Sequence, residues 1–137
     1  MDIRMDNGLL LASCTLSYQN TSALINNVLI DTGCAVSIFD IDLMEAMGLK
    51  PDCNSARIVR MYGVGGGSEA CIEQEVHNLC IDNHICRQFR IQLGPIQSEY
   101  GFEAILGNDF MLACGLTIDL RQLTVLQHHA RDVLFLN

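Results

Sequence analysis

The sequence is poor in basic residues and contains no long apolar run. Lys and Arg together number 8 against 16 Asp and Glu, which gives a formal net charge of −8. This balance argues against non-specific nucleic-acid binding, which depends on basic patches, and against docking on an anionic membrane surface. No apolar run reaches the length of about 18 residues that a membrane-spanning helix needs. We therefore expect neither nucleic acid nor a membrane as a partner.

The sequence also lacks a CxxC motif and a signal-peptide core. It shows no repeat, linker or low-complexity segment. The apolar run at residues 9–12 is too short for a secretory leader, so a cytoplasmic location is expected. The seven cysteines are odd in number and do not fit a small secreted disulfide framework, which favours reduced thiols. The spacing of His77, Cys80, His84 and Cys86 matches no common zinc pattern. Core or surface thiols are favoured there, and we expect no metal and no cofactor.

What is present predicts one mostly β domain over residues 1–137. Half of the residues are hydrophobic, which is enough for a single core. Apolar and polar residues alternate through much of the chain, as is typical of strands, and two short segments have helical spacing. Strands are expected at 8–18, 21–30, 37–39, 57–62, 69–79, 83–93, 104–107, 116–120, 123–127 and 133–136, helices within 40–51 and 108–115, and a loop at 94–101.

The segment "VLIDTGCAVSIFD", residues 28–40, places a carboxylate directly after an apolar run. Asp31 follows Val28, Leu29 and Ile30, whose neighbours would otherwise be core. A carboxylate in such a place is costly to bury unless it is hydrogen-bonded, paired or used in chemistry. Taken alone, Asp31 could be a turn residue that satisfies its own backbone. The remaining motifs decide between these interpretations.

Two further segments follow in order. "MYGVGGGSEA", residues 61–70, lies between two predicted strands and indicates a hairpin with a glycine-rich tip. A nucleotide-binding loop is the weaker interpretation, because no strand-loop-helix context follows and Glu69 would repel phosphate. "AILGNDFMLACGLTIDL", residues 104–120, combines a short buried strand with a glycine and a short helix.

In this order and spacing the three segments resemble the retropepsin-like aspartic peptidases, the single-domain relatives of pepsin, over residues 8–126. The resemblance implies a retropepsin-like acid-protease barrel with two short helices and a glycine-rich flap hairpin. It also implies that Asp31 is catalytic, that the Thr32 hydroxyl ties the two active-site loops together, and that Gly33 permits the tight turn. The implied flap residues are Gly63, Val64, Gly65, Gly66 and Gly67, and the implied loop beneath the active site is Ile105, Leu106 and Gly107.

Two positions depart from the pattern of that family. Cys34 stands where Ala is usual, and it is small enough to fit. Its thiol could make activity redox-sensitive if it is reachable, whereas a buried inert thiol is the more common state of a free cysteine. Asn108 stands where viral members have an Arg that supports the dimer. Whether a dimer is locked in the viral manner is therefore open.

Aspartic peptidases need two carboxylates that share one proton, and like charges held that close cannot both ionise. This chain has one Asp-Thr-Gly and no second such motif, since Asp109 and Asp119 fall in the later helix and strand. The second aspartate must come from another copy, so the resemblance implies a homodimer. The apolar tail at 133–136 is expected to pair with the stretch at residues 3–11 of either chain. Deleting residues 133–137 should then weaken the dimer and the activity in parallel.

The expected function is therefore an aspartic endopeptidase that hydrolyses peptide or protein substrates. The alternative is a catalytically silent module that keeps the fold for binding or dimerisation, since fold does not imply function. Met61, Val64, Ile96 and Ile105 are apolar residues near the implied site. They suggest hydrophobic side chains beside the scissile bond.

Overall fold

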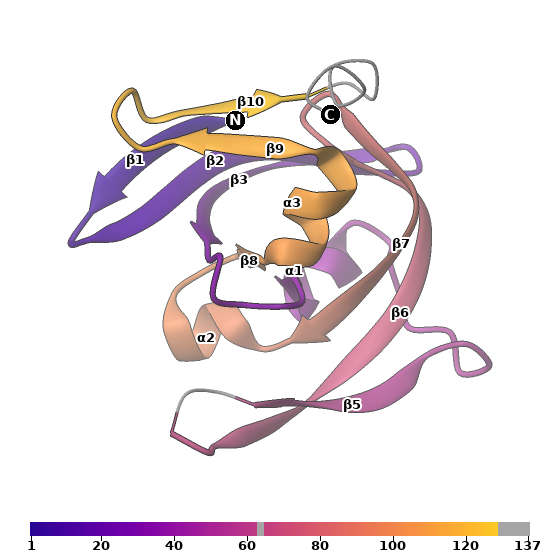
Figure 1. Cartoon of the computed structure of the whole chain (residues 1–137). Helices are drawn as coiled ribbons and strands as arrows, with labels where there is room; N and C mark the ends of the chain where they lie inside the picture. Colours follow the sequence, from indigo (N-terminus) through magenta and orange to yellow (C-terminus); the bar gives the residue numbers. More distant parts are fainter. Residues whose placement is uncertain (63–64, 129–137) are drawn as a thin grey trace, which may run out of the picture.

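The computed structural model describes residues 1–62 and 65–128 and is mostly β, as predicted (Figure 1). The strands are β1 (Asp2–Asp6), β2 (Leu9–Tyr18), β3 (Thr21–Ile30), β4 (Ile38–Asp40), β5 (Arg57–Tyr62), β6 (Ser68–Ile81), β7 (His84–Gly94), β8 (Ala104–Leu106), β9 (Leu116–Asp119) and β10 (Thr124–Gln127). The helices are α1 (Ile41–Ala46), α2 (Ile96–Tyr100) and α3 (Asn108–Cys114). The predicted strand at 133–136 lies outside the described residues.

Six strands close into a ring in the order β2, β3, β8, β4, β7 and β6, and the ring is completed by pairing of β2 with β6. β1 and β5 extend this sheet at its two ends, and β9 with β10 forms a separate hairpin. The pairs β3–β8 and β4–β7 are parallel. Because β3 and β8 run in the same direction and Ile30 is opposite Leu106, the two strands end side by side.

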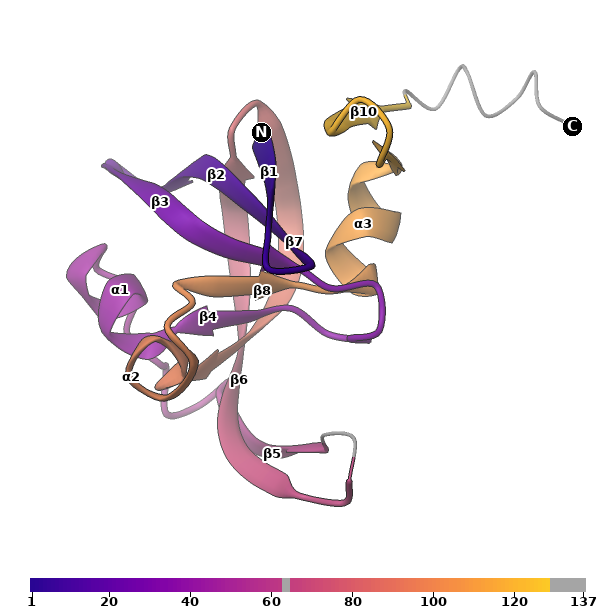
Figure 2. The same cartoon turned by 90° about the vertical axis from the view of Figure 1, so that its left-hand side faces the viewer.

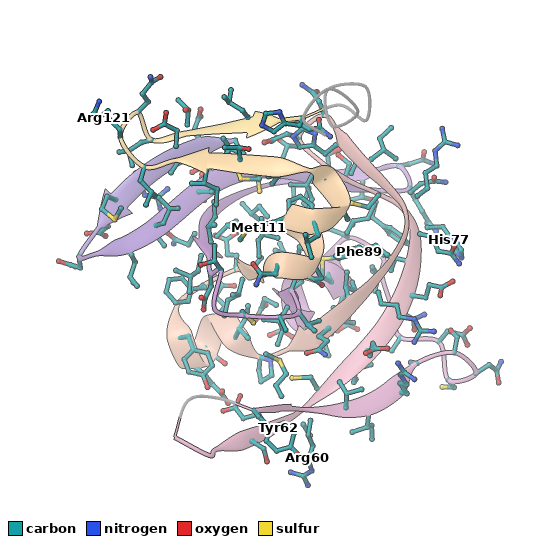
Figure 3. All side chains as sticks on the ribbon, viewed as in Figure 1. Arg60, Tyr62, His77, Phe89, Met111 and Arg121 are labelled. Atoms are coloured by element: carbon teal, nitrogen blue, oxygen red, sulfur yellow. The ribbon has the colours of Figure 1, made fainter. Side chains whose placement is uncertain are left out.

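The alternation of apolar and polar residues along the strands places apolar side chains on the inner face of the ring. On β2 the side chains of Ala12, Cys14 and Leu16 are buried, while those between them are more exposed. β7 lies against α3 through an edge-to-face contact of Phe89 with Phe110, whose ring centroids are 6.3 Å apart. Figure 3 shows Phe89 beside that helix. Such a pair adds about 1 kcal/mol beyond the area that it buries, so α3 is anchored firmly to the core.

The flap-like hairpin of β5 and β6 is confirmed. The two strands pair from Arg57 opposite Glu73 to Tyr62 opposite Ser68. The hairpin extends beyond the ring, and its tip turns toward the side on which the loop between β3 and β4 lies (Figure 2). Arg60, on β5, points away from the rest of the molecule (Figure 3). The hairpin therefore stands over the C-terminal end of β3.

Helix α1 is confirmed where it was predicted, and Asp40 is its N-cap. The Leu43 N–H donates to Asp40 Oδ2 at 3.2 Å, which satisfies one of the free N–H groups of the first turn. Met44 is buried beneath the helix. The chain leaves the helix through Gly48, whose φ of +85° is a left-handed conformation that favours glycine.

Two elements were not predicted. The expected loop at 94–101 contains α2, so the domain has three short helices in its described part rather than two. The N–H of Gln97, in the first turn of α2, donates to Asp40 Oδ1 at 3.0 Å. β1 was not expected either, because its mostly exposed side chains give no apolar alternation. It is held as an edge strand by pairing with β2 and by Arg4, which donates to the Asn26 carbonyl at 2.8 Å.

Candidate active site

Asp31 is the first residue after β3, at the point where β3 and β8 end together. Its N–H donates to the Leu106 carbonyl at 3.0 Å, which ties the start of the turn to the neighbouring strand. Its carbonyl accepts from Cys34 N–H at 3.1 Å, which closes the turn. The side chain of Asp31 is half-buried. The turn therefore fixes the backbone of this carboxylate and leaves its side chain reachable.

Gly33 and Gly107, two of the glycines of the implied site, allow close approaches that a side chain would hinder. The N–H of Gly33 donates to Asp31 Oδ1 at 2.9 Å, and a Cβ at Gly33 would lie 3.1 Å from that oxygen. A Cβ at Gly107 would lie 2.6 Å from the Cys34 carbonyl oxygen, closer than real Cβ atoms come. Gly107 therefore lets the end of β8 pack against the Asp31 turn. Ile105 and Leu106 precede it on β8, and the role expected for residues 105–107 stays a prediction.

Helix α3 begins directly under the Asp31 turn and donates to it. The N–H of Asn108 donates to the Cys34 carbonyl at 2.8 Å, and the N–H of Asp109 donates to the Ala35 carbonyl at 3.2 Å. The side-chain amide of Asn108 donates to the Thr32 carbonyl at 2.7 Å. Thr32 itself is exposed. The tie expected from the Thr32 hydroxyl involves a second copy and stays a prediction.

A buried serine and a carboxylate, which sequence reasoning did not assign to the site, hold the turn from behind. Ser37 is 0% exposed, and its hydroxyl donates to Asp109 Oδ1 at 2.7 Å. Its N–H lies 2.9 Å from the same oxygen, and the N–H of Gly107 donates to Ser37 Oγ at 2.9 Å. The position of Asp109 in the first turn of α3 could be recognised from the sequence as favourable, because carboxylates stabilise helix N-termini. Its pairing with Ser37 was not visible in the sequence.

A groove of about 690 Å³ opens beside Asp31. Its walls come from the Asp31 turn, the β5–β6 hairpin, the strands of the ring, and α2 together with Phe102. The lining residues are Leu29, Asp31, Gly33, Cys34, Ala35, Ile38, Met61, Tyr62, Gly67, Ser68, Glu69, Ile96, Tyr100, Phe102 and Ile105. Met61, Ile96 and Ile105, three of the four apolar residues suggested from the sequence, are among them. A mostly apolar groove beside the reachable Asp31 carboxylate is suited to holding an apolar peptide.

Two glycines near the hairpin tip adopt left-handed backbone conformations. Gly65 and Gly66 have φ angles of +104° and +85°, which residues with a side chain rarely adopt. Gly67 lines the groove. Gly63 and Val64, also assigned to the flap, lie outside the described residues.

A polar contact joins the hairpin to α2 at the edge of the groove. The Tyr100 hydroxyl donates to Glu69 Oε1 at 2.9 Å. This hydrogen bond to a carboxylate raises the pKa of Tyr100 above its usual value near 10. The negative charge of Glu69 also raises the pKa of the neighbouring Glu99. Two carboxyl groups and a phenol therefore meet where the flap strand returns toward α2.

Cys34 lines the groove, and its thiol is held by its own turn. Cys34 Sγ donates to the Val36 carbonyl at 3.0 Å. Burial raises the pKa of this thiol above its ordinary value, which outweighs the opposite effect of the hydrogen bond. The thiolate is the nucleophilic form, so a raised pKa lowers reactivity. These features favour the inert-thiol interpretation over a redox switch.

The other residues considered for chemistry are spread apart. His77 lies on the outer side of β6 (Figure 3), whereas Cys86 is buried with its sulfur 4.0 Å from that of Cys114. Cys80 donates instead to the Asp82 carbonyl. Across residues 1–62 and 65–128, no three His, Cys, Asp or Glu side chains gather as a metal site would require. None of the helices in that part of the chain is long and apolar enough to cross a membrane.

The ring, the flap hairpin and the Asp31 turn over Gly107 together define a retropepsin-like fold. Solved structures agree with this assignment. The retroviral protease-like domain of Ddi1 from Leishmania major matches with a TM-score of 0.54 and 18% identity, over 87% of this chain and 89% of that domain. A retropepsin-like aspartic protease from Rickettsia conorii matches with a TM-score of 0.58 and 15% identity, over 85% of this chain and 82% of that protein. No family model and no curated protein sequence matches the chain.

Proposed function

We propose that the chain is an aspartic endopeptidase that acts as a homodimer and hydrolyses peptide bonds with a dyad of two Asp31 residues. One observation carries the proposal. The Asp31 carboxylate lies on a turn at the end of two parallel strands and opens onto a groove that residues of the flap hairpin line. The matches to protease-like and protease structures support the fold of such an enzyme.

In the proposed reaction the two Asp31 carboxyl groups share one proton. The ionised group takes a proton from a water molecule, which attacks the scissile carbonyl. The protonated group donates its proton to the carbonyl oxygen, which gives a tetrahedral diol. The C–N bond then breaks as the carboxyl group that took the proton of the water gives it to the leaving amine, while the other carboxylate takes a proton back from a diol hydroxyl, and no acyl-enzyme forms. The N–H of Gly33 holds one oxygen of each carboxylate, which keeps the other free to face the water. The flap would exclude solvent and hold the peptide as an added strand.

The proposal requires a second copy of the chain. The groove described here contains one Asp31. Asp109 cannot replace the missing partner, because both of its oxygens lie within 3.0 Å of the Ser37 N–H beneath the turn. A symmetric dimer would bring two identical turns together about its axis.

The substrate is proposed to be a peptide with hydrophobic residues beside the scissile bond. Met61 on the flap, Ile96 on α2 and Ile105 on β8 approach the groove from three different elements. Apolar side chains of a bound peptide would gain about 25 cal/mol per Å² of surface that they bury against such walls. A silent binding module of the same fold is the competing proposal, and it predicts binding without cleavage.

The first prediction tests catalysis directly. Asp31→Asn should abolish cleavage of peptides with paired hydrophobic residues, because an amide cannot exchange the proton. Fold and dimer should be unchanged, since the introduced amide oxygen can still accept from Gly33 N–H. The measurement is peptide cleavage at mildly acid pH, with a pepstatin-like transition-state mimic as inhibitor.

Asp42→Asn is the matched control, because Asp42 is exposed on α1 and is not part of the groove. It should cleave at the rate of the unmodified chain. Equal cleavage rates in Asp31→Asn and the unmodified protein would exclude this site as a peptidase centre. Tight binding of peptides without any cleavage by the unmodified protein would favour the silent module.

A further inference from the structure

Both polar groups of the peptide unit between Thr32 and Gly33, the carbonyl and the N–H, form hydrogen bonds to side chains. Its carbonyl oxygen accepts from Asn108 Nδ2 at 2.7 Å. Its N–H donates to Asp31 Oδ1 at 2.9 Å. A continuous line of hydrogen bonds therefore runs from the start of α3, through one peptide plane, to the proposed catalytic carboxylate.

We propose that Asn108 is a positioning residue that orients the Asp31 carboxylate through the Thr32–Gly33 peptide group. The inference rests on the proposed peptidase function. It assigns a role within one subunit to the position where viral retropepsins have an arginine that supports the dimer.

The planarity of the peptide bond makes this relay effective. The carbonyl and N–H of one peptide group turn together, because the C–N bond has partial double-bond character. Thr32 and Gly33 are both exposed, and glycine adds backbone freedom at the point where the plane could tilt. Holding the Thr32 oxygen therefore fixes the direction in which the Gly33 N–H points. Hydrogen bonds in such a chain also polarise one another, so a held carbonyl strengthens the N–H as a donor.

The side chain of Asn108 can be tested apart from its backbone. Its own N–H already donates to the Cys34 carbonyl, and the neighbouring Asp109 N–H donates to Ala35. These two bonds keep the turn docked on α3 when the side chain is removed. The Thr32 carbonyl is the part of the contact that depends on the Asn108 amide.

The first test is Asn108→Ala. Losing one hydrogen bond that orients a reacting group should lower kcat about tenfold, with KM and the dimer dissociation constant unchanged. Sedimentation and steady-state kinetics measure these quantities on the same sample. A variant whose activity falls only because its dimer dissociates would contradict the inference, and so would an unchanged kcat.

The second test uses Asn108→Asp, which has nearly the same size and shape. When ionised, the introduced carboxylate cannot donate and faces the Thr32 oxygen. When protonated, it can donate again. The activity of the variant relative to the unmodified chain should therefore recover as the pH falls through the carboxyl range near about 4. Asp31, Cys34 and Asp109 are the ionisable groups around this position, and the unmodified chain measured at each pH is the reference. A ratio that does not change with pH would contradict the donor role.

The third measurement does not depend on activity. Hydrogen exchange of the Gly33 amide should be about tenfold faster in Asn108→Ala than in the unmodified protein, because the peptide plane is released. Unchanged exchange would overturn the inference even if the enzyme is active. If the unmodified chain shows no cleavage but the Gly33 amide responds as expected, the proposed function fails while the relay stands.

Discussion

Asp31 is the residue on which the interpretation of the sequence depended, and the structure explains how a carboxylate is accommodated there. The N–H of Asp31 is bonded to Leu106 and its carbonyl to Cys34, so the backbone is satisfied by the turn and by the adjacent strand. One side-chain oxygen accepts from Gly33, as a simple turn residue would also do. The groove beside the carboxylate is the observation that favours the proposed catalytic role over that of a simple turn residue.

Cys34 gives the second prediction. Its raised pKa keeps the thiol protonated near neutral pH, and its sulfur is already bonded to the Val36 carbonyl. Mild peroxide should therefore leave peptide cleavage unchanged, and Cys34→Ala should retain the activity of the unmodified protein. The measurement is cleavage rate before and after treatment.

Cys53 is an exposed free cysteine that lies away from the groove, and Cys53→Ala controls for oxidation elsewhere. Loss of activity in the unmodified protein and in Cys53→Ala, but not in Cys34→Ala, would show that the Cys34 thiol is a redox switch after all.

Among the secondary-structure elements, α1 and α2 share one capping residue. Asp40 is 2% exposed and accepts from the N–H of Leu43 in α1 and of Gln97 in α2. Since α2 supplies Ile96 and Tyr100 to the groove, this buried carboxylate links the core to the groove wall.

The third prediction concerns this shared cap. Asp40→Ala should lower the free energy of unfolding by about 2 kcal/mol, because two buried N–H groups lose their acceptor. Glu45→Ala, at an exposed position outside the first turn of the same helix, should change it by less than about 0.5 kcal/mol. Chemical denaturation measures both. Equal effects of the two substitutions would contradict the shared-cap interpretation.

The contact between the flap strand and α2 gives the fourth prediction, which concerns pH. Glu69 raises the pKa of Glu99 in the folded state, so the folded protein holds this proton more tightly than the unfolded chain does. The resulting stabilisation is fully present below the ordinary glutamate value of 4.5 and is lost as the pH rises through the raised value. The hydroxyl of Tyr100 stays protonated throughout, because its pKa is also raised.

Glu99→Gln should therefore be more stable than the unmodified protein toward neutral pH, and the difference should shrink as the pH falls below about 4.5. Melting temperatures across this range measure the effect. Glu45→Gln, at an exposed position on α1, is the control and should show no such trend. A constant difference between Glu99→Gln and the unmodified protein would contradict the coupling of Glu99 to Glu69.

The elements that were predicted correctly are those whose signal is local. The alternation in β2 and β3, the hairpin of β5 and β6 and the helical spacing of α1 can all be read within a few residues. Helix α2 could not be predicted in this way, because its first turn is capped from a residue 57 positions earlier in the chain. The same holds for Ser37 and Asp109, which are 72 positions apart. Only the closed ring brings these pairs together.

The whole molecule presents half of a proposed active site. In the described part of each chain, the ring brings the Asp31 turn, the flap hairpin and the groove beside Asp31 together. The sheet ends at β5, in the flap hairpin, on one side and at β1 on the other. β10 lies next to β1 (Figure 1). An edge strand offers unpaired backbone groups to a second chain. The expected pairing of residues 133–136 with this region stays a prediction, because that segment lies outside the described residues.

The fifth prediction tests whether two chains share one catalytic centre. Sedimentation of the unmodified protein at micromolar concentration, combined with cleavage rates over a dilution series, measures assembly and activity together. We predict a dimer at these concentrations, with activity per chain falling steeply as dilution separates the subunits. A strict monomer that still cleaves peptides would contradict the shared Asp31 dyad.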